Sequence, residues 1–390
     1  MSKRKRKILK LNAISPLADA IFAGYGYSDS CEDPDGIMVR SAQMADYKVG
    51  ESLIAVARAG AGTNNIPVAD YAEKGIVVFN TPGANANAVK ELVICELFLG
   101  GRKITEAIDW VKTLKGEGEN VGKLVEKGKS KFVGHEITGK MLGVIGLGAI
   151  GVAVANAAYG LNMEVMGTDP YLSTMNALAL SPHINVVPAR EDIYKKADFI
   201  TIHAPLNSDT RGMINKETIA MMKDGVVIIN NSRGELVNTD DIIEALESGK
   251  VGRYITDFPN DKLIGVKNCI CVPHLGASTP EAEDNCAVMA AHQLVDYIEN
   301  GNITNSVNYP SVSLARDEGK GRVCILHRNV KNIITKFTSA ISEQGLNIAH
   351  MASSSRGEYA CSILEIDGEI PAKTIEAITA VEGVLRVRSL

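Results

Sequence analysis

One stretch, residues 142–169, limits what this chain can fold into more than any other. It reads LGVIGLGAIGVAVANAAYGLNMEVMGTD. An apolar run at Leu142–Ile145 has the pattern of a buried strand, residues 146–151 fit G-x-G-x-x-G, and an alanine-rich helical segment follows. A second short strand then leads to Asp169. Strand, glycine loop, helix, strand and acid are the parts of a dinucleotide-binding unit, in that order.

Each glycine of this loop has its own task. Gly146 permits the tight turn out of the strand, Gly148 lets the backbone approach a pyrophosphate, and Gly151 lets the helix lie close to the sheet. The phosphates would lie at the helix N-terminus, where unpaired N–H groups favour negative charge. Asp169 comes 18 positions after Gly151, close to the ~20 expected for an acid that binds the ribose. Because a carboxylate there repels a 2′-phosphate, the sequence predicts NAD rather than NADP. The alternative is a glycine-rich structural turn.

The composition excludes several classes of protein. The 390 residues suffice for two or three domains, and no apolar run approaches the ~18 residues of a membrane span. The net charge of −5 gives no general attraction to nucleic acid. The basic residues at 1–7 lack the apolar region of a secretory signal, so we expect a solvated terminus. The seven cysteines are scattered without a C-x-x-C pair, so we expect reduced thiols in a cytoplasmic protein and no metal site.

Short apolar runs alternate with helical stretches through most of the chain, which predicts an α/β fold with parallel strands. A long helix from Asn85 to about Ala107 would bridge two domains. We expect a flavodoxin-like substrate-binding domain at residues 1–92 and 283–310. A doubly wound Rossmann-type NAD domain would occupy residues 93–282.

Residues 321–390 form a separate unit in this interpretation. Strand patterns at Val323–Leu326 and Val384–Val387 enclose two helical patterns and a hairpin around Arg356-Gly357. The resulting order, βαββαβ, is that of a ferredoxin-like domain.

Two candidate functional residues follow predicted strands, at the sheet edge where ligands bind in open parallel sheets. Arg233 follows the strand Val226–Asn230, and its guanidinium can bind a carboxylate through two parallel N–H···O bonds; the alternative is an ordinary surface arginine. His274, in Pro-His-Leu-Gly, follows another strand, and an imidazole suits proton exchange near neutral pH. His203 also ends a strand and, by this argument alone, competes with His274.

Two acids lie near a proline in the same region. Asp261 is a candidate to orient the imidazole, as the third member of a catalytic triad does. Asp257 is a candidate to face the nicotinamide carboxamide. Both can instead be turn residues beside Pro259, since aspartate is common in turns. The spacing alone does not separate these interpretations.

The glycine loop with Asp169, the Asn-Ser-Arg-Gly segment at Arg233 and the Pro-His-Leu-Gly-Ala-Ser segment at His274 resemble the D-isomer-specific 2-hydroxyacid dehydrogenases. The resemblance extends over nearly the whole chain. It implies NAD-dependent oxidation of 3-phospho-D-glycerate to 3-phosphohydroxypyruvate, the first step of L-serine biosynthesis, by a homodimer or homotetramer. Residues 321–390 resemble the ACT domain, which implies regulation by an effector such as L-serine.

The resemblance also implies roles for single residues. Arg233 would bind the substrate carboxylate, His274 would exchange the proton, and Asp261 would pair with the histidine. The residues implied in cofactor binding are Gly146, Gly148, Ala149, Ile150, Gly151, Asp169, His203, Ala204, Pro205, Asn231, Ser232, Arg233, Asp257, His274 and Gly276. Those implied in substrate binding are Arg40, Ser41, Gly62, Thr63, Asn64, Asn85 and Lys90, and those implied in effector binding are His327, Asn329 and Asn347.

Some positions depart from the family pattern, and two other functions compete. Asp261 stands where the family usually has Glu, Thr256 competes with Asp257 because the alignment can slip by one, and Lys90 is either a phosphate ligand or a solvated helix residue. The rivals are a hydroxypyruvate or glyoxylate reductase of the same family and a non-catalytic NAD-sensing scaffold. Arg40 and the ACT-like segment argue against the first rival. The catalytic set of Arg233, Asp261 and His274 argues against the second.

Overall fold

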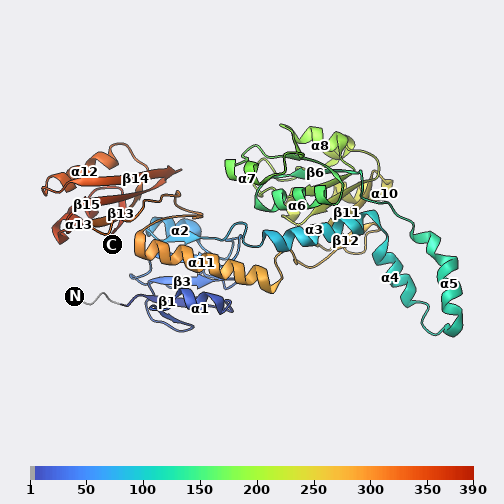
Figure 1. Cartoon of the computed structure of the whole chain (residues 1–390), viewed down its shortest axis with the longest axis horizontal. Helices are drawn as coiled ribbons and strands as arrows, with labels where there is room; N and C mark the ends of the chain where they lie inside the picture. Colours follow the sequence, from blue (N-terminus) through green and yellow to red (C-terminus); the bar gives the residue numbers. More distant parts are fainter. Residues whose placement is uncertain (1–4) are drawn as a thin grey trace. The chain divides into compact units, whose positions relative to one another are not determined.

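The computed structural model describes residues 5–390, and Figure 1 shows the chain coloured along its sequence. The sequence predicted a solvated basic cluster at residues 1–7. Of these, residues 1–4 lie outside the described residues. The last residue of that cluster, Lys7, begins the first strand. Within this described part of the chain, no helix is both long and apolar enough to cross a bilayer.

The chain forms two compact units. One contains the residues up to Asn85 together with Pro280–Leu390, and the other is Ala86–Thr279. The chain changes unit where α3 (Ala86–Gly101) and α11 (Pro280–Asn300) begin. The predicted boundaries at 92/93 and 282/283 fall inside these two helices, and the division into three domains stays a prediction.

The first unit contains a five-stranded parallel sheet in the order β2-β1-β3-β4-β5. This is the flavodoxin-like order, which confirms the predicted fold class for this part. Strands β3 and β5 are fully buried, as expected for short apolar runs covered on both faces of a parallel sheet. From α11, Ala290 and Leu294 belong to the same apolar cluster as Ile8 and Met38 of the sheet. The bounds are β1 Lys7–Leu11, α1 Leu17–Ile21, β2 Gly26–Ser28, β3 Gly36–Val39, β4 Ala55–Arg58, α2 Val68–Glu73 and β5 Val77–Phe79.

The second unit contains a seven-stranded parallel sheet in the order β12-β11-β10-β9-β6-β7-β8. Its first six strands in chain order have the Rossmann arrangement 3-2-1-4-5-6, which confirms the predicted doubly wound fold. The strand order reverses between β6 and β9, and dinucleotides bind outside the carboxyl ends of strands at such a point. The bounds are β6 Met141–Ile145, α6 Ala149–Gly160, β7 Glu164–Thr168, α7 Thr174–Ala179, β8 Asn185–Val186, α8 Arg190–Lys196, β9 Phe199–Ile202, α9 Lys216–Ala220, β10 Val226–Asn230, α10 Thr239–Ser248, β11 Val251–Thr256 and β12 Cys269–Cys271.

The helix predicted from Asn85 to about Ala107 ends earlier in the structure. Helix α3 stops at Gly101, and a separate helix, α4 (Ile104–Lys112), follows. The reason is a tertiary contact: the backbone N–H of His135 donates to the carbonyl of Gly101 at 2.6 Å. A Cβ at Gly101 would lie only 2.9 Å from the carbonyl oxygen of His135. Helices α4 and α5 (Val121–Gly128) extend beyond the sheet of this unit in Figure 1.

The C-terminal part of the first unit is a four-stranded antiparallel sheet in the order β14-β15-β13-β16, with the predicted βαββαβ chain order. Its two faces join different cores because side chains alternate along a strand. Val323 and Ile325 pack with Phe337 of α12 on one face, whereas Cys324 and Leu326 belong to the apolar cluster of α11. The bounds are β13 Lys320–Arg328, α12 Ile333–Ser342, β14 Ile348–Arg356, β15 Tyr359–Asp367, α13 Ala372–Thr379 and β16 Val384–Ser389.

Candidate active site

The glycine loop between β6 and α6 has the shape that a pyrophosphate needs. Gly146 has φ +96°, and a Cβ on Gly151 would lie 1.9 Å from the carbonyl oxygen of Gly146. A Cβ on Gly148 would meet no atom within 4 Å, so the space above this residue is open. Gly148 is also the N-cap of α6 and has no side-chain cap. The N–H groups of the first helical turn are therefore available to an anion.

Asp169 lies directly beside this loop. Its Oδ2 accepts a hydrogen bond from the backbone N–H of Leu147 at 2.9 Å, and its Oδ1 accepts one from Tyr171 at 2.8 Å. Each carboxylate oxygen can accept a further bond, so the group can still bind ribose hydroxyls. The loop and the acid together fit NAD.

His203, the competitor of His274, follows β9 at the point where the strand order reverses. Its Nε2 lies 3.0 Å from Thr201 Oγ1, and burial lowers the pKa of His203 to about 4. The neutral imidazole is thus a weak proton acceptor near pH 7. This favours His274 for proton exchange.

Arg233 and His274 come together around the ring of Phe258. The guanidinium carbon of Arg233 lies 6.0 Å from the ring centroid, at the limit of a cation–π contact. The imidazole centroid of His274 lies 4.7 Å from the same centroid. His274 is exposed and lines a cavity of about 540 Å³ with Phe258 and Asp257. The structure therefore gathers a guanidinium and an imidazole from two separate loops, and Phe258, which sequence reasoning missed, connects them.

Of the two predicted acids, Asp257 lines the same cavity as His274. Asp257 is 1% exposed, and its Oδ2 accepts a hydrogen bond from the backbone N–H of Gly276 at 3.2 Å. Burial raises the pKa of Asp257, and the charges of His274 and Arg233 act against this rise. Asp261 is exposed.

The outward position of Asp261 has a local cause. Asn260 begins a turn in which its backbone and side-chain oxygens both accept from the N–H of Leu263. Leu263 is buried, which leaves Asp261 on the solvent side. No hydrogen bond or ion pair is found between the Asp261 side chain and any residue from 5 to 390. The pairing of Asp261 with His274 stays a prediction.

A further acid, Glu96 of α3, was missed in the sequence. It is 1% exposed, and its Oε2 accepts a hydrogen bond from Asn231 Nδ2 at 2.6 Å. The available signal was an acidic residue within the buried face formed by Val93 and Leu97. The neighbouring Ser232 Oγ donates to the carbonyl of Ala204 at 3.0 Å.

In the first unit, the predicted substrate residues lie at the carboxyl ends of β3 and β4. Arg40 forms an ion pair with Glu283 of α11, and Ser41 Oγ accepts from Asn12 at 3.0 Å. Asn65, at the end of the loop that contains Gly62, Thr63 and Asn64, donates to the carbonyl of Ala42 at 2.8 Å. The residue missed here is Arg58, the last residue of β4.

Arg58 brings a second guanidinium to the same edge of the sheet. Its Nε donates to the carbonyl of Arg40 at 3.2 Å. A Cβ on Gly60 would lie 1.7 Å from Arg58 Nη1, so the loop passes directly over this side chain. The signal in the sequence was an arginine directly before the glycine-rich segment.

The remaining two substrate candidates, Asn85 and Lys90, lie near the change of unit. Asn85 Oδ1 is buried and has no hydrogen-bond partner among the residues that the structure describes. Lys90 Nζ donates to Asn87 Oδ1 at 2.6 Å and lies 3.7 Å from Glu91. The Lys90 amine is thus engaged with its own helix.

Comparison with known proteins identifies the family. Residues 97–276 match the model of the D-isomer specific 2-hydroxyacid dehydrogenase, NAD binding domain. D-3-phosphoglycerate dehydrogenase of Escherichia coli (strain K12) is 32% identical over 353 residues, which cover 87% of this chain and 82% of that protein. The chain belongs to the D-isomer specific 2-hydroxyacid dehydrogenases. Since the matched domain of this family binds NAD, the predicted cofactor is confirmed.

Two further relatives of this dehydrogenase extend the comparison. D-3-phosphoglycerate dehydrogenase of Homo sapiens is 35% identical over 293 residues, which cover 73% of this chain and 52% of that protein. The crystal structure of cofactor (NAD+) bound 3-phosphoglycerate dehydrogenase of Entamoeba histolytica has a TM-score of 0.60 at 27% identity. It covers 78% of this chain and 98% of that chain.

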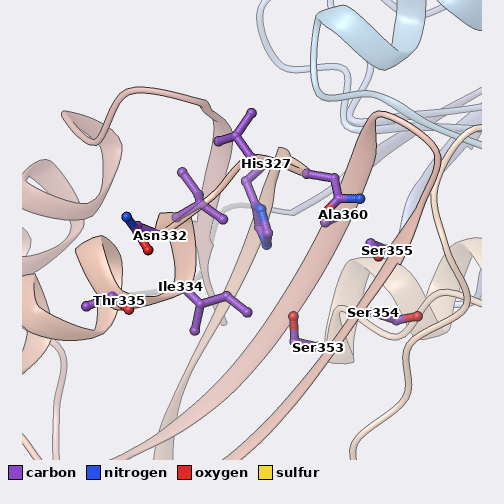
Figure 2. Close-up of a pocket in the computed structure, with 11 residues that line it drawn as sticks. His327, Asn332, Ile334, Thr335, Ser353, Ser354, Ser355 and Ala360 are labelled. Atoms are coloured by element: carbon purple, nitrogen blue, oxygen red, sulfur yellow. The ribbon is translucent and has the colours of Figure 1, made fainter.

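The C-terminal sheet of the dehydrogenase contains a cavity of about 380 Å³ (Figure 2). His327 and Asn329, two of the three predicted effector residues, line it together with Ser353 on β14. Both ring nitrogens of His327 are engaged, one with the carbonyl of Arg328 at 2.8 Å and the other with a serine hydroxyl at 2.9 Å. The third residue, Asn347, is exposed and donates to Asp367 instead. The structure therefore brings two of the three residues to one cavity.

Proposed function

We propose that this dehydrogenase oxidises 3-phospho-D-glycerate to 3-phosphohydroxypyruvate with NAD, which begins L-serine biosynthesis. The observation that carries the proposal is the gathering of Arg233 and His274 around Phe258 in a member of this family. The names of the relatives that align with most of the chain support the phosphorylated substrate. When bound, NAD supplies the acceptor for the hydride that leaves C2 of the substrate.

The residues of this chain then have distinct tasks. The Arg233 guanidinium orients the substrate carboxylate through two parallel hydrogen bonds. A ring nitrogen of His274 accepts the proton of the C2 hydroxyl. The buried carboxylate of Asp257 stabilises the imidazolium that results, whereas the family resemblance implied that Asp261 pairs with the histidine. Phe258 fixes the relative position of the two reacting side chains through its ring contacts.

We assign the phosphate of the substrate to the carboxyl ends of β3 and β4. Arg40 and Arg58 supply two positive charges there, and the glycine-rich loop supplies backbone N–H groups. The phosphate would compete with Glu283 for Arg40. Substitution of Arg58 by Met should therefore raise the KM for 3-phosphohydroxypyruvate more than that for hydroxypyruvate.

A spectrophotometric assay of NADH oxidation tests the function. We expect 3-phosphohydroxypyruvate to be reduced with a higher kcat/KM than hydroxypyruvate or glyoxylate, and a preference for the unphosphorylated acids would support the reductase alternative. His274→Asn should lower kcat by roughly 10²–10⁴-fold, with NADH binding retained. Full activity of that variant would remove His274 from the mechanism, and no NADH oxidation with any 2-oxo acid would favour the scaffold.

We also propose that residues 321–390 form an ACT domain that binds L-serine in the cavity of Figure 2. The support is the βαββαβ topology and a cavity lined by polar side chains at His327, Asn329 and Ser353. L-serine should lower the rate of the wild type, and Asn329→Ala should weaken this effect. Unchanged rates at millimolar serine would remove the proposal.

The exposed apolar residues of α4 support a homo-oligomer. Ile104, Ile108 and Val111 are 40%, 52% and 48% exposed, and α4 contains no buried residue. Trp110 of α4 packs on Phe132, with ring centroids 5.3 Å apart. We propose that a second copy of the chain covers this exposed face of α4. Sedimentation of the wild type and of Ile108→Glu tests the proposal.

All seven cysteines are free, which supports a cytoplasmic location.

A further inference from the structure

The second unit contains a buried carboxyl group that the proposed mechanism does not use. Glu96 Oε2 accepts from Asn231, whereas Glu96 Oε1 is buried and has no hydrogen-bond partner among residues 5–390. Buried carboxyl groups normally have a cation or several donors. Two neighbouring acceptors, Asn231 Oδ1 and Asp257 Oδ1, are also buried without a partner in that part of the chain.

The surroundings of Glu96 favour its neutral form. Burial raises the pKa of Glu96 to about 8; the hydrogen bond from Asn231 acts against this rise, and the charge of Asp257 adds to it. Asp257 in turn interacts electrostatically with Arg233 and His274. Ionised Glu96 would place a second negative charge near Asp257 without a cation of its own.

Asn231 begins the segment that presents Arg233. The contacts that hold this segment include three from side chains: Glu96 to the Asn231 side chain, Ser232 Oγ to the carbonyl of Ala204, and Asn230 Nδ2 to the carbonyl of Arg233 at 2.8 Å. The first contact is the only one of the three that joins the segment to α3. Without it the buried amide of Asn231 would lack its acceptor, which costs free energy and permits the segment to move.

We propose that Glu96 is a positioning residue of the dehydrogenase site. As a neutral carboxylic acid it holds Asn231, and through Asn231 the segment that presents Arg233 to the substrate carboxylate. The role of Arg233 rests on the proposed function. A glutamine at position 96 is neutral, has the same length and keeps an oxygen that can accept from Asn231, whereas an alanine removes that acceptor.

Kinetics of Glu96→Ala and Glu96→Gln test the proposal, with Glu164→Gln as the matched control, because Glu164 is the exposed first residue of β7. We expect Glu96→Ala to raise the KM for 3-phosphohydroxypyruvate about 10-fold, as for the loss of a buried hydrogen bond, with a smaller change in kcat and in NADH affinity. The KM of Glu96→Gln should be close to that of the wild type. A wild-type KM in the alanine variant, or equal loss in a glutamine variant with the wild-type melting temperature, would overturn the proposal.

Infrared spectroscopy of the cofactor-free protein gives a second readout that does not depend on turnover or on the folding of Glu96→Ala. At pH 7 the wild type and Glu164→Gln should show the carbonyl stretch of a protonated carboxylic acid that Glu96→Gln lacks. Absence of this band from the wild type would refute the neutral acid. Failure of the wild type to reduce 3-phosphohydroxypyruvate would refute the proposed substrate instead, and the KM comparison would then use the 2-oxo acid that is reduced.

Discussion

At the scale of single residues, the proposed function depends on which groups lie beside His274. His274 is exposed and contacts Phe258, while the buried Asp257 approaches it from the end of β11. In the proposed function, a carboxylate in this position stabilises the protonated imidazole. The exposed Asp261 lacks the burial that makes such an interaction strong.

Paired substitutions of the two acids separate these assignments. We expect Asp257→Asn to lower kcat/KM by on the order of 10²-fold, as the loss of the group that supports a catalytic histidine does. Asp261→Asn should have a much smaller effect. Steady-state kinetics across pH 6–9 measure both, and the reverse ranking would return the task to Asp261.

The pH dependence of stability follows from the shifted pKa of Glu96. This pKa rises from 4.5 to about 8 in the folded protein, so the folded state retains a proton that the unfolded chain releases. The contribution of this proton on Glu96 to the free energy of unfolding is complete below about pH 4.5. It is lost as the pH rises to about 8. In this window the free energy of unfolding falls by up to about 1.4 kcal/mol per pH unit.

The substitution Glu96→Gln should remove this fall in the free energy of unfolding, because glutamine does not titrate. Its melting temperature relative to the wild type should therefore be more favourable at pH 8 than at pH 5, as measured by thermal unfolding of the cofactor-free protein. The control Glu164→Gln should show no such trend. If the difference in melting temperature between Glu96→Gln and the wild type stays constant with pH, the raised pKa of Glu96 is contradicted.

At the scale of elements, two glycines of the loop between β6 and α6 have different roles, one in folding and one in binding. The Cβ position of Gly151 is filled by the carbonyl of Gly146, while that of Gly148 opens into free space. One glycine is therefore required by the packing of the helix against its own loop. The other has no such packing requirement, and we assign it to a ligand that approaches the backbone.

Alanine at each position tests this distinction. Gly151→Ala should lower the melting temperature, because a Cβ 1.9 Å from a carbonyl oxygen forces the helix away from the loop. Gly148→Ala should leave the melting temperature of the cofactor-free protein near that of the wild type and weaken NADH binding at least about 10-fold. Calorimetry and NADH fluorescence titration measure the two effects. Equal NADH affinity in Gly148→Ala would place the pyrophosphate elsewhere.

At the scale of the whole molecule, buried arginines join the C-terminal sheet to the rest of the first unit. Arg322 is fully buried, pairs with Glu365 at 2.6 Å and donates to the carbonyls of Asn300 and Leu314 at 3.0 Å. Arg388 donates to two carbonyls in the last turn of α11, where the helix dipole favours positive charge. These contacts make the sheet part of one compact unit.

Removal of one partner of the buried pair should be costly. Arg322→Met leaves Glu365 buried without its cation, which we expect to lower the free energy of unfolding by about 3–5 kcal/mol. The double variant Arg322→Met/Glu365→Gln should recover part of this loss, since it leaves no unpaired charge. Chemical denaturation measures both, and a neutral single variant would show that the pair does not support the docked sheet.

The sequence by itself determined the features that depend on neighbours along the chain. The G-x-G-x-x-G loop, the acid at Asp169, the alternation of strands and helices and the βαββαβ order all follow from local periodicity and turn chemistry. The candidates Arg233 and His274 were predicted for the same reason, since each follows a strand of the parallel sheet.

Only the tertiary structure decided which side chains meet across the fold. Glu96 and Asn231 are 135 positions apart, and no local pattern pairs an acid on one helix with an amide after a distant strand. The exposure of Asp261 likewise depends on the turn that Asn260 makes and on the burial of Leu263. Contacts of this kind depend on how the elements pack, because burial sets the charge and strength of each polar group.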